Sequence, residues 1–246
     1  MSHAARTREG AGGGGLRGRA GIGCSGRAGI GPGVVAMAVL LGGAAQGGAA
    51  DGHPRHLIYL HGHIVQAQQD ARPEHPRFGH YELQQIEDAL RDRGFVVHAK
   101  IRPKSASVSD SADRVVEQVR QLLDSGVPAR NVSVVGASMG GTIALLAAAR
   151  LQEEEVRFCV LGTCLDTTVR HLRVNEGKGP IGHILSIREA SDDLVGQCRI
   201  WRDEIEPHPG LLAREILLDT GLSHGFLYRP LPEWVEPVVD WAGAGG

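Results

Sequence analysis

A short apolar strand that turns sharply into a helix of small residues is the feature that most constrains this chain. The strand is predicted over residues 132–135, the turn is Gly136-Ala-Ser138-Met-Gly140, and the helix is predicted over residues 142–150. This is a G-x-S-x-G pattern in a strand–turn–helix context. Side chains at its two glycines would collide with the neighbouring strand or helix. We therefore expect the Ser138 hydroxyl to stand above the sheet edge, at a helix N-terminus where backbone N–H groups can stabilise an oxyanion.

The same pattern occurs a second time, around Ser223 in Gly221-Leu-Ser-His-Gly225. A strand predicted over residues 215–218 precedes it, but Pro230 follows within a few residues. That proline is expected to deny Ser223 the helix that such a turn requires. Ser138 is therefore the candidate nucleophile, and an ordinary glycine turn is the alternative interpretation of its motif.

Strands and helices are predicted to alternate along the chain after Asp51. Apolar runs indicate strands, and apolar residues spaced three and four apart indicate amphipathic helices, one of them with Ser111 as its N-cap. Besides those above, the expected strands are 56–60, 95–101, 156–161 and 183–187, and the expected helices are 81–93, 111–123 and 233–242. This alternation predicts an α/β fold: a mostly parallel sheet with helices on both faces. Ligands bind beyond the carboxyl ends of the strands in such sheets.

Residues 1–50 differ in composition from the rest of the chain. They hold 16 of the 35 glycines, and five arginines against one acid, Glu9. Such a segment buries too little apolar surface to become ordered, so we expect a disordered leader followed by one folded domain over residues 51–246. Within the leader, an apolar run over residues 34–41 follows Arg27 and precedes small residues, which is the layout of a signal peptide. Export is therefore expected, and a low-complexity cytoplasmic tail is the alternative.

The charge of the folded part excludes one class of partner. From Asp51 onward the chain has 26 − 5 = 21 basic and 28 − 1 = 27 acidic residues, a net charge of −6. Phosphate binding requires a basic face, so we expect no nucleic-acid partner. The apolar run over residues 34–41 is too short to cross a bilayer as a stable helix.

Candidate partners for Ser138 follow two later strands. Asp192 and Asp193 come after the strand at 183–187, and His224 comes after the strand at 215–218. A serine nucleophile needs a base, and the base needs a carboxylate that orients it. The order Ser138, Asp192, His224 is the order found in α/β-hydrolases. We expect all three residues to meet at one edge of the sheet.

From His56 onward the chain resembles small bacterial α/β-hydrolases, in particular compact carboxylesterases and dienelactone-hydrolase-like enzymes. The resemblance is carried by Tyr59-Leu-His61-Gly62, Gly136-Ala-Ser138-Met-Gly140, Glu189-Ala-Ser-Asp192 and Gly221-Leu-Ser-His224-Gly-Phe226. It implies the α/β-hydrolase fold, with Ser138 as nucleophile, His224 as base and Asp192 as acid. The length of residues 51–246 leaves no room for a large lid domain. Typical dienelactone hydrolases have a cysteine where this chain has Ser138.

The resemblance also implies finer assignments. The family's acid commonly lies in a G-x-x-D-x-x-V loop; here Glu189 replaces the glycine, while Asp192 and Val195 keep the pattern. Asp192 is therefore favoured over Asp193, which stays the alternative. The backbone N–H groups of Met139 and His63 are implied as the oxyanion hole.

Histidines, cysteines and one insertion in the sequence suggest further features. No cofactor is expected, and a metal site built from His61, His63, His75 and His80 is a rival that lacks an evident carboxylate ligand. His61 is expected to order its loop. Cys159 is expected to be buried, and export would permit a disulfide between Cys164 and Cys198. Residues 166–181 form the main insertion able to roof the pocket.

The sequence thus predicts a serine hydrolase that cleaves small ester or thioester substrates through an acyl-enzyme. One alternative is a catalytically silent binding protein with the α/β-hydrolase fold, because fold does not settle function. Another is an amidase or peptidase of the same fold, which would use the same three residues.

Overall fold

The computed structural model describes residues 52–163, 172, 177, 179–195 and 211–243. They belong to one compact unit, Ala45–Gly246. The expected leader, most of the insertion at 166–181, and both Cys164 and Cys198 lie outside the described residues.

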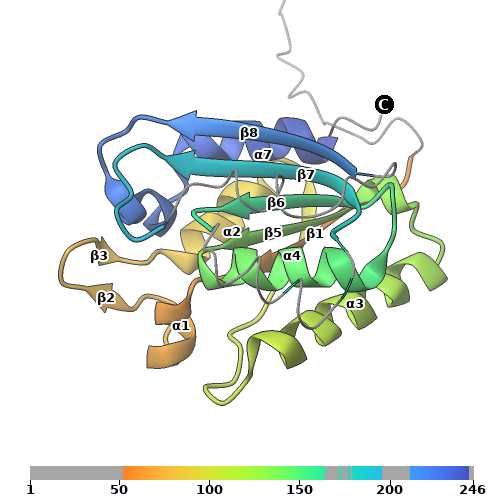
Figure 1. Ribbon diagram of the computed structural model, residues 1–246, viewed down its shortest axis with the longest axis horizontal. Coiled ribbons are helices and arrows are strands. Elements are labelled where there is room, and N and C mark those ends of the chain that lie inside the picture. Colours follow the sequence, from red (N-terminus) through yellow and green to blue (C-terminus); the bar gives the residue numbers. More distant parts are fainter. Residues whose placement is uncertain (1–51, 164–171, 173–176, 178, 196–210, 244–246) are drawn as a thin grey trace, which may run out of the picture. The chain divides into compact units, whose positions relative to one another are not determined.

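A parallel six-stranded sheet forms the centre of this unit (Figure 1). Its strand order is β4-β1-β5-β6-β7-β8, and every neighbouring pair is parallel. The carboxyl ends of the strands therefore lie at a single edge, on the left in Figure 1. The strands are β1 Arg55–Leu60, β4 Phe95–Ala99, β5 Val132–Ala137, β6 Arg157–Leu161, β7 Gly182–Glu189 and β8 Leu211–Leu218.

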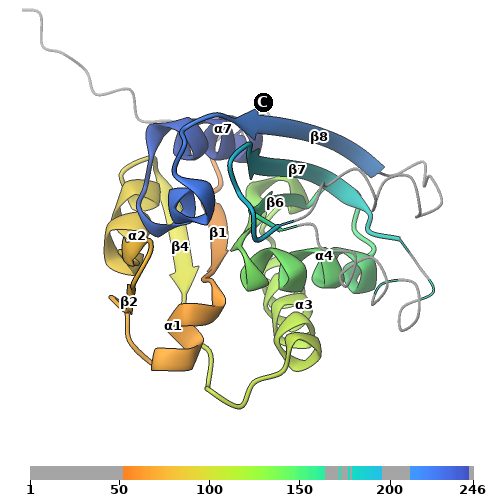
Figure 2. The same ribbon diagram turned by 60° about the vertical axis from the view of Figure 1, so that its left-hand side comes forward.

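Helices cover both faces of the sheet (Figure 2). On one face lie α3 (Val108–Asp124) and α4 (Met139–Leu151), and on the other lie α2 (Leu83–Arg91) and α7 (Pro232–Gly243). Each face has its own apolar core, and the side chains of the central strands alternate between the two cores. The predicted α/β class with a mostly parallel sheet is confirmed.

Two helices begin earlier than the sequence predicted. Helix α3 starts at Val108, because Ser107 is its N-cap and accepts a hydrogen bond from the Asp110 N–H at 3.0 Å. The prediction that Ser111 caps this helix is wrong: Ser111 is buried within it and donates its hydroxyl to the Ser107 carbonyl oxygen. Helix α4 starts at Met139 rather than Thr142, despite the low helix propensity of the two glycines in its first turn.

Short elements gather at the carboxyl edge of the sheet. They are helix α1 (His63–Gln68), the hairpin of β2 (Glu74–His75) and β3 (Gly79–His80), and the 3₁₀ helix η3 (Ser223–Tyr228). A further 3₁₀ turn, η1 (Ala129–Asn131), precedes β5. The prediction that Pro230 prevents a helical turn after Ser223 is wrong, because η3 completes its turns before the proline is reached. Within the described residues, no separate lid domain covers this edge.

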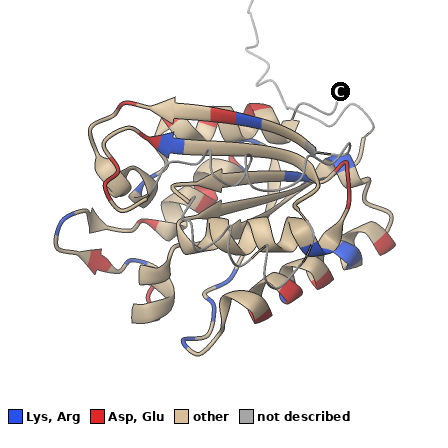
Figure 3. Ribbon diagram, in the orientation of Figure 1, with Lys and Arg blue, Asp and Glu red and all other residues tan. Residues whose placement is uncertain are grey.

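Acidic and basic residues are interspersed along α3 and the strands β7 and β8 (Figure 3). No helix in the described part of the chain combines the length and the apolar character needed to cross a bilayer.

Candidate active site

Ser138 lies in the turn between β5 and α4, where it is the N-cap of α4. Its backbone has φ 53° and ψ −120°, a conformation that an L-residue adopts only at a cost. The turn is fixed to the neighbouring strand, since the Ser138 N–H donates to the Leu161 carbonyl oxygen at 2.8 Å. The Ser138 carbonyl oxygen accepts hydrogen bonds from the Thr163 hydroxyl and from the Gly141 N–H. Hydrogen bonds on both sides of the residue thus hold the strained conformation.

The glycines of this turn allow backbone segments to approach one another closely. A Cβ atom at Gly136 would overlap the Gly140 carbonyl, and one at Gly140 would overlap the Leu60 carbonyl oxygen. A Cβ at Gly141 would collide with the Thr163 hydroxyl. The structure therefore shows the steric requirement for glycine that the sequence pattern predicts at this turn.

His224 lies between Ser138 and Asp192. Its Nε2 is 3.0 Å from the Ser138 Oγ, and its Nδ1 is 2.6 Å from the Asp192 Oδ2. An ionised carboxylate can only accept, so Nδ1 carries the proton that is donated to Asp192, and Nε2 is left to accept the Ser138 hydroxyl proton. The side chains of His224 and Asp192 are 10% and 3% exposed. The three side chains thus form one hydrogen-bonded chain, whose base and acid are largely shielded from water.

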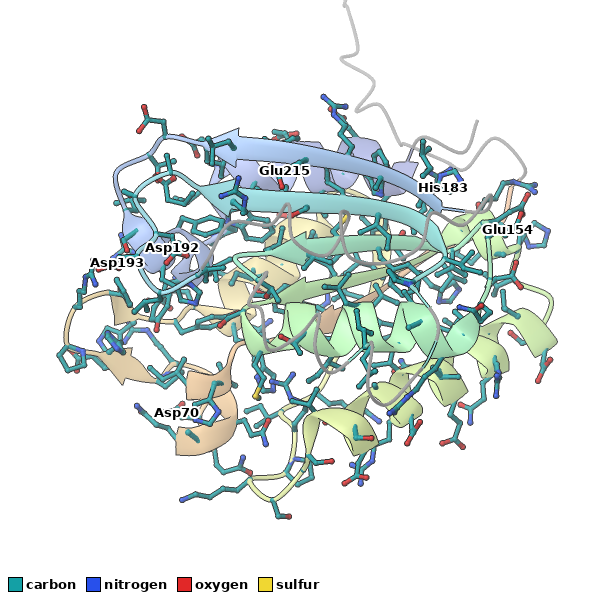
Figure 4. The ribbon with its side chains drawn as sticks, viewed as in Figure 1. Asp70, Glu154, His183, Asp192, Asp193 and Glu215 are labelled. Carbon is teal, nitrogen blue, oxygen red and sulfur yellow. The ribbon has the colours of Figure 1, made fainter. Side chains whose placement is uncertain are left out.

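The two candidate acids, Asp192 and Asp193, follow the carboxyl end of β7 (Figure 4). Asp192 also accepts a hydrogen bond from the Leu194 N–H at 3.0 Å, which fixes its carboxylate. Asp193 instead forms an ion pair with Arg77 at 3.0 Å and accepts from the Ser223 hydroxyl at 3.1 Å. The hydrogen bonds from Arg77 and Ser223 lower the pKa of Asp193. Of the two, Asp192 is the one whose carboxylate contacts the imidazole.

The two expected oxyanion donors, Met139 and His63, are the first residues of α4 and α1. A backbone N–H at this position has no acceptor within its own helix. The loop that precedes α1 lies against the serine, because a Cβ built on Gly62 would be 3.6 Å from the Ser138 Cβ. This arrangement is compatible with the predicted oxyanion hole.

Arg102 and His61 order that loop. The His61 Nδ1 bonds the Gly62 carbonyl oxygen at 2.9 Å, and its Nε2 accepts from the Arg102 N–H at 3.1 Å. The Arg102 guanidinium donates to the His61 carbonyl oxygen at 2.6 Å. Burial and the Arg102 charge lower the pKa of His61 to about 4, and burial lowers the pKa of Arg102 to about 10. Both ring nitrogens of His61 are thus engaged within the protein.

The described residues do not favour the rival metal site. Among them, no three or more His, Cys, Asp or Glu side chains are grouped so that they could hold a metal ion. Cys159 is buried and free, as its position within a strand predicted, and burial raises the pKa of its thiol.

Two residues that the sequence did not single out contact the imidazole region. Gly162 has φ 55°, and a Cβ there would be 2.8 Å from the Leu227 Cδ1 and 3.4 Å from the His224 Cε1. A glycine directly after a strand at the sheet's carboxyl edge is a signal that would have identified it. The Phe78 ring, in the β2–β3 hairpin, has its centre 6.3 Å from that of His224. Nothing in the sequence pattern indicates this contact.

A cavity of about 270 Å³ opens beside the serine. Apart from His224, no ionisable side chain of the described residues lines it. Its lining consists of Val108, Ser138, Met139, Thr142, Gly162, Thr163, Leu194, Val195 and His224.

Comparisons with known proteins identify the fold. No protein-family model matches the sequence, and the comparison with curated protein sequences gives no match. Among solved structures, the chain is similar to Arabidopsis thaliana SOBER1, with 12% identity and a TM-score of 0.51 over 78% of this chain and 99% of that one. It is also similar to Est1E from Butyrivibrio proteoclasticus, solved with ferulic acid bound, with 13% identity and a TM-score of 0.50 over 78% and 87% of the two chains. With its six-stranded parallel sheet and the sharp turn at Ser138, the chain has the α/β-hydrolase fold.

Proposed function

We propose that this protein is a serine hydrolase that cleaves small ester or thioester substrates through an acyl-enzyme on Ser138. The observation that carries the proposal is the position of the His224 imidazole, 3.0 Å from the Ser138 Oγ and 2.6 Å from the Asp192 carboxylate. A general base within hydrogen-bond reach of a hydroxyl, and itself oriented by a third group, is the arrangement that activates a serine nucleophile.

In the first half of the reaction, His224 accepts the Ser138 proton as Oγ attacks the substrate carbonyl carbon. The imidazolium that forms is stabilised by Asp192, whose side chain is almost fully buried. The tetrahedral oxyanion is stabilised by the backbone N–H groups of Met139 and His63. The leaving group then takes the proton from His224 and departs.

In the second half, water replaces the leaving group. The same imidazole removes a proton from the water, which attacks the acyl carbon and releases Ser138 with its proton restored. Both halves need Nε2 as an acceptor, so protonation of His224 in the free enzyme blocks the reaction.

The cavity beside Ser138 supports a small apolar acyl group. Val108, Leu194 and Val195 contribute apolar surface to its lining, and its volume is about 270 Å³. Among the described residues, this apolar lining matches acetyl and other short-chain acyl groups, so we propose short-chain esters as the substrates.

Covalent labelling with a fluorophosphonate probe, mapped by mass spectrometry, tests the proposal. We expect labelling at Ser138 of the wild-type protein, turnover of p-nitrophenyl acetate, and the loss of both in the Ser138→Ala variant. A folded wild-type protein that neither labels nor turns over an ester would contradict the proposal and favour a binding protein of the same fold. Turnover of peptide or amide substrates at a rate above that of esters would instead indicate an amidase.

A further inference from the structure

The carboxylate of Glu189, the last residue of β7, is buried at the carboxyl edge of the sheet. Glu189 is 3% exposed. Its Oε1 accepts from the Ser191 hydroxyl at 2.9 Å, the Gly221 N–H at 3.2 Å and the Ser191 N–H at 3.3 Å. Its Oε2 accepts from the Thr220 hydroxyl at 2.8 Å and the Thr220 N–H at 3.0 Å. All five donors are neutral groups.

These donors belong to the two loops that carry Asp192 and His224. Ser191 directly precedes Asp192, and Thr220 and Gly221 lie in the loop that leads to His224. A second connection runs between the same loops, because the Ser191 hydroxyl oxygen accepts from the Ser223 N–H at 3.0 Å. One carboxylate thus joins a loop that follows β7 to a loop that follows β8.

The side chain acts as an ionised acceptor. Burial alone would raise the pKa of Glu189, but the hydrogen bonds from Thr220 and Ser191 outweigh it and lower the pKa below its usual value. An amide could not replace the carboxylate, because its NH₂ group would face a backbone N–H in either orientation. A hydroxyl can reverse its hydrogen bond, but a backbone N–H cannot.

We propose that Glu189 is a positioning residue for the active site: its carboxylate sets the separation of the two loops and thereby the Asp192–His224–Ser138 alignment. The inference rests on the proposed serine-hydrolase function for its kinetic consequences. Glu189 does not line the cavity beside Ser138, so it acts on the position of the imidazole and not on substrate contacts. A displacement of about 1 Å in a reacting group is sufficient to lower a rate about 10²-fold.

The kinetic test compares Glu189→Gln with a matched change on the neighbouring strand. Glu215 lies along β8 and pairs with Arg188 at 3.0 Å, away from both loops (Figure 4). For Glu189→Gln we expect kcat to fall about 10- to 100-fold on p-nitrophenyl acetate while KM stays within about 2-fold. For Glu215→Gln we expect both constants to stay within about 2-fold of wild type. A wild-type kcat in the Glu189→Gln variant, or a loss that appears only in KM, would overturn the proposal.

A spectroscopic test is independent of turnover. The Nδ1 proton of His224, held between the imidazole and Asp192, is expected to give a low-field proton NMR resonance that is absent in His224→Ala. We expect this resonance to broaden or disappear in Glu189→Gln and to persist in Glu215→Gln. An unchanged resonance in folded Glu189→Gln would refute the positioning role even if the protein hydrolyses esters. If the wild-type protein shows no turnover, the resonance still tests the alignment of His224 with Asp192. The serine-hydrolase proposal and the positioning role of Glu189 can therefore be refuted independently.

If Glu189→Gln does not fold, Thr220→Val replaces it. This change removes the hydroxyl that donates to Glu189, and with it the acceptor of the Leu222 N–H at 3.3 Å, and keeps the side-chain shape and the Thr220 backbone N–H. We expect a kcat about 3- to 10-fold below wild type with an unchanged KM, since one of the five hydrogen bonds to the Glu189 carboxylate is lost. A wild-type kcat in Thr220→Val would then reject the proposal.

Discussion

Ser138 and Ser223 have nearly the same backbone φ, 53° and 52°, yet only the hydroxyl of Ser138 contacts the His224 imidazole. The Ser223 hydroxyl lies instead against Asp193 and Arg77, and Ser223 begins a 3₁₀ helix. Both serines fit the same sequence pattern, and both adopt a conformation that is rare for a residue with a side chain. The neighbouring base, and not the positive φ, therefore distinguishes the candidate nucleophile.

Replacement of Ser223 should leave the chemistry in place. We expect Ser223→Ala to keep kcat within about 3-fold, because its backbone N–H still donates to Ser191 and the lost hydroxyl contacts, with Asp193 and Arg77, do not involve His224. Ser138→Ala should lower kcat by about 10⁴-fold or more. Steady-state kinetics on p-nitrophenyl acetate measure both, and equal losses in the two variants would contradict the assignment of Ser138.

The two neighbouring aspartates should respond very differently to the same change. Asp192→Asn is expected to lower kcat by about 10⁴-fold, since the amide no longer enforces the Nδ1–H tautomer of His224. Asp193→Asn removes an exposed ion pair with Arg77 and should change kcat only a few-fold. Parallel kinetics on the two variants check this, and the reverse ranking would exchange their roles.

Alanine substitution should destabilise the fold more at the glycines of the Ser138 turn than at a glycine that has a positive φ but open space around it. A Cβ at Gly140 would overlap the Leu60 carbonyl oxygen, whereas one at Gly126, where φ is 91°, would meet nothing within 4 Å. We expect Gly126→Ala to lower the free energy of unfolding by about 1 kcal/mol and Gly140→Ala by about 3 kcal/mol or more. Urea unfolding monitored by circular dichroism measures both values. A smaller loss of unfolding free energy in Gly140→Ala than in Gly126→Ala would show that the turn at Ser138 relaxes to accept a side chain.

Acidification should destabilise the fold through His61. The pKa of His61 falls from 6.5 to about 4 on folding, so the unfolded chain takes up this proton at a higher pH than the folded protein. The contribution of neutral His61 to the free energy of unfolding is complete above about pH 6.5. It is lost as the pH falls toward 4, by up to about 3 kcal/mol. In urea unfolding at pH 7 and pH 4.5, we expect His61→Asn to lose less stability between the two pH values than wild type. A variant with the wild-type pH dependence would rule out His61 as a source of the effect.

The sheet and the turn at Ser138 could be predicted because their sequence signals are local and repeated. Central strands that are buried on both faces appear as apolar runs, as in β5, where all six residues are buried. The glycines around Ser138 carry a steric requirement that any fold with such a turn must satisfy. The order of Asp192 and His224 along the chain then places both residues beyond strand ends at the same edge.

The remaining features depend on contacts between distant segments. The β2 and β3 strands have two residues each, too few for any periodicity, so the placement of Phe78 against His224 has no sequence signal. Ser107 and Ser111 are both plausible caps in the sequence, and the structure shows that Ser107 accepts the hydrogen bond from the first turn of the helix. The sequence marks Glu189 only as a departure from a glycine pattern. Its role as an acceptor depends on Thr220, 31 positions away, which donates to it.

The all-parallel strand order has a consequence for the kinetics of folding. Parallel pairing joins strands that a long crossover connection separates, and such non-local contacts form slowly. The contact between His224 and Ser138 spans 86 positions and depends on β8, an edge strand that pairs only with β7 in the described sheet. During refolding, we therefore expect esterase activity to return no earlier than the slowest phase of tryptophan fluorescence. Catalytic competence would then mark the docking of the final strand, and partly folded chains would be inert toward esters.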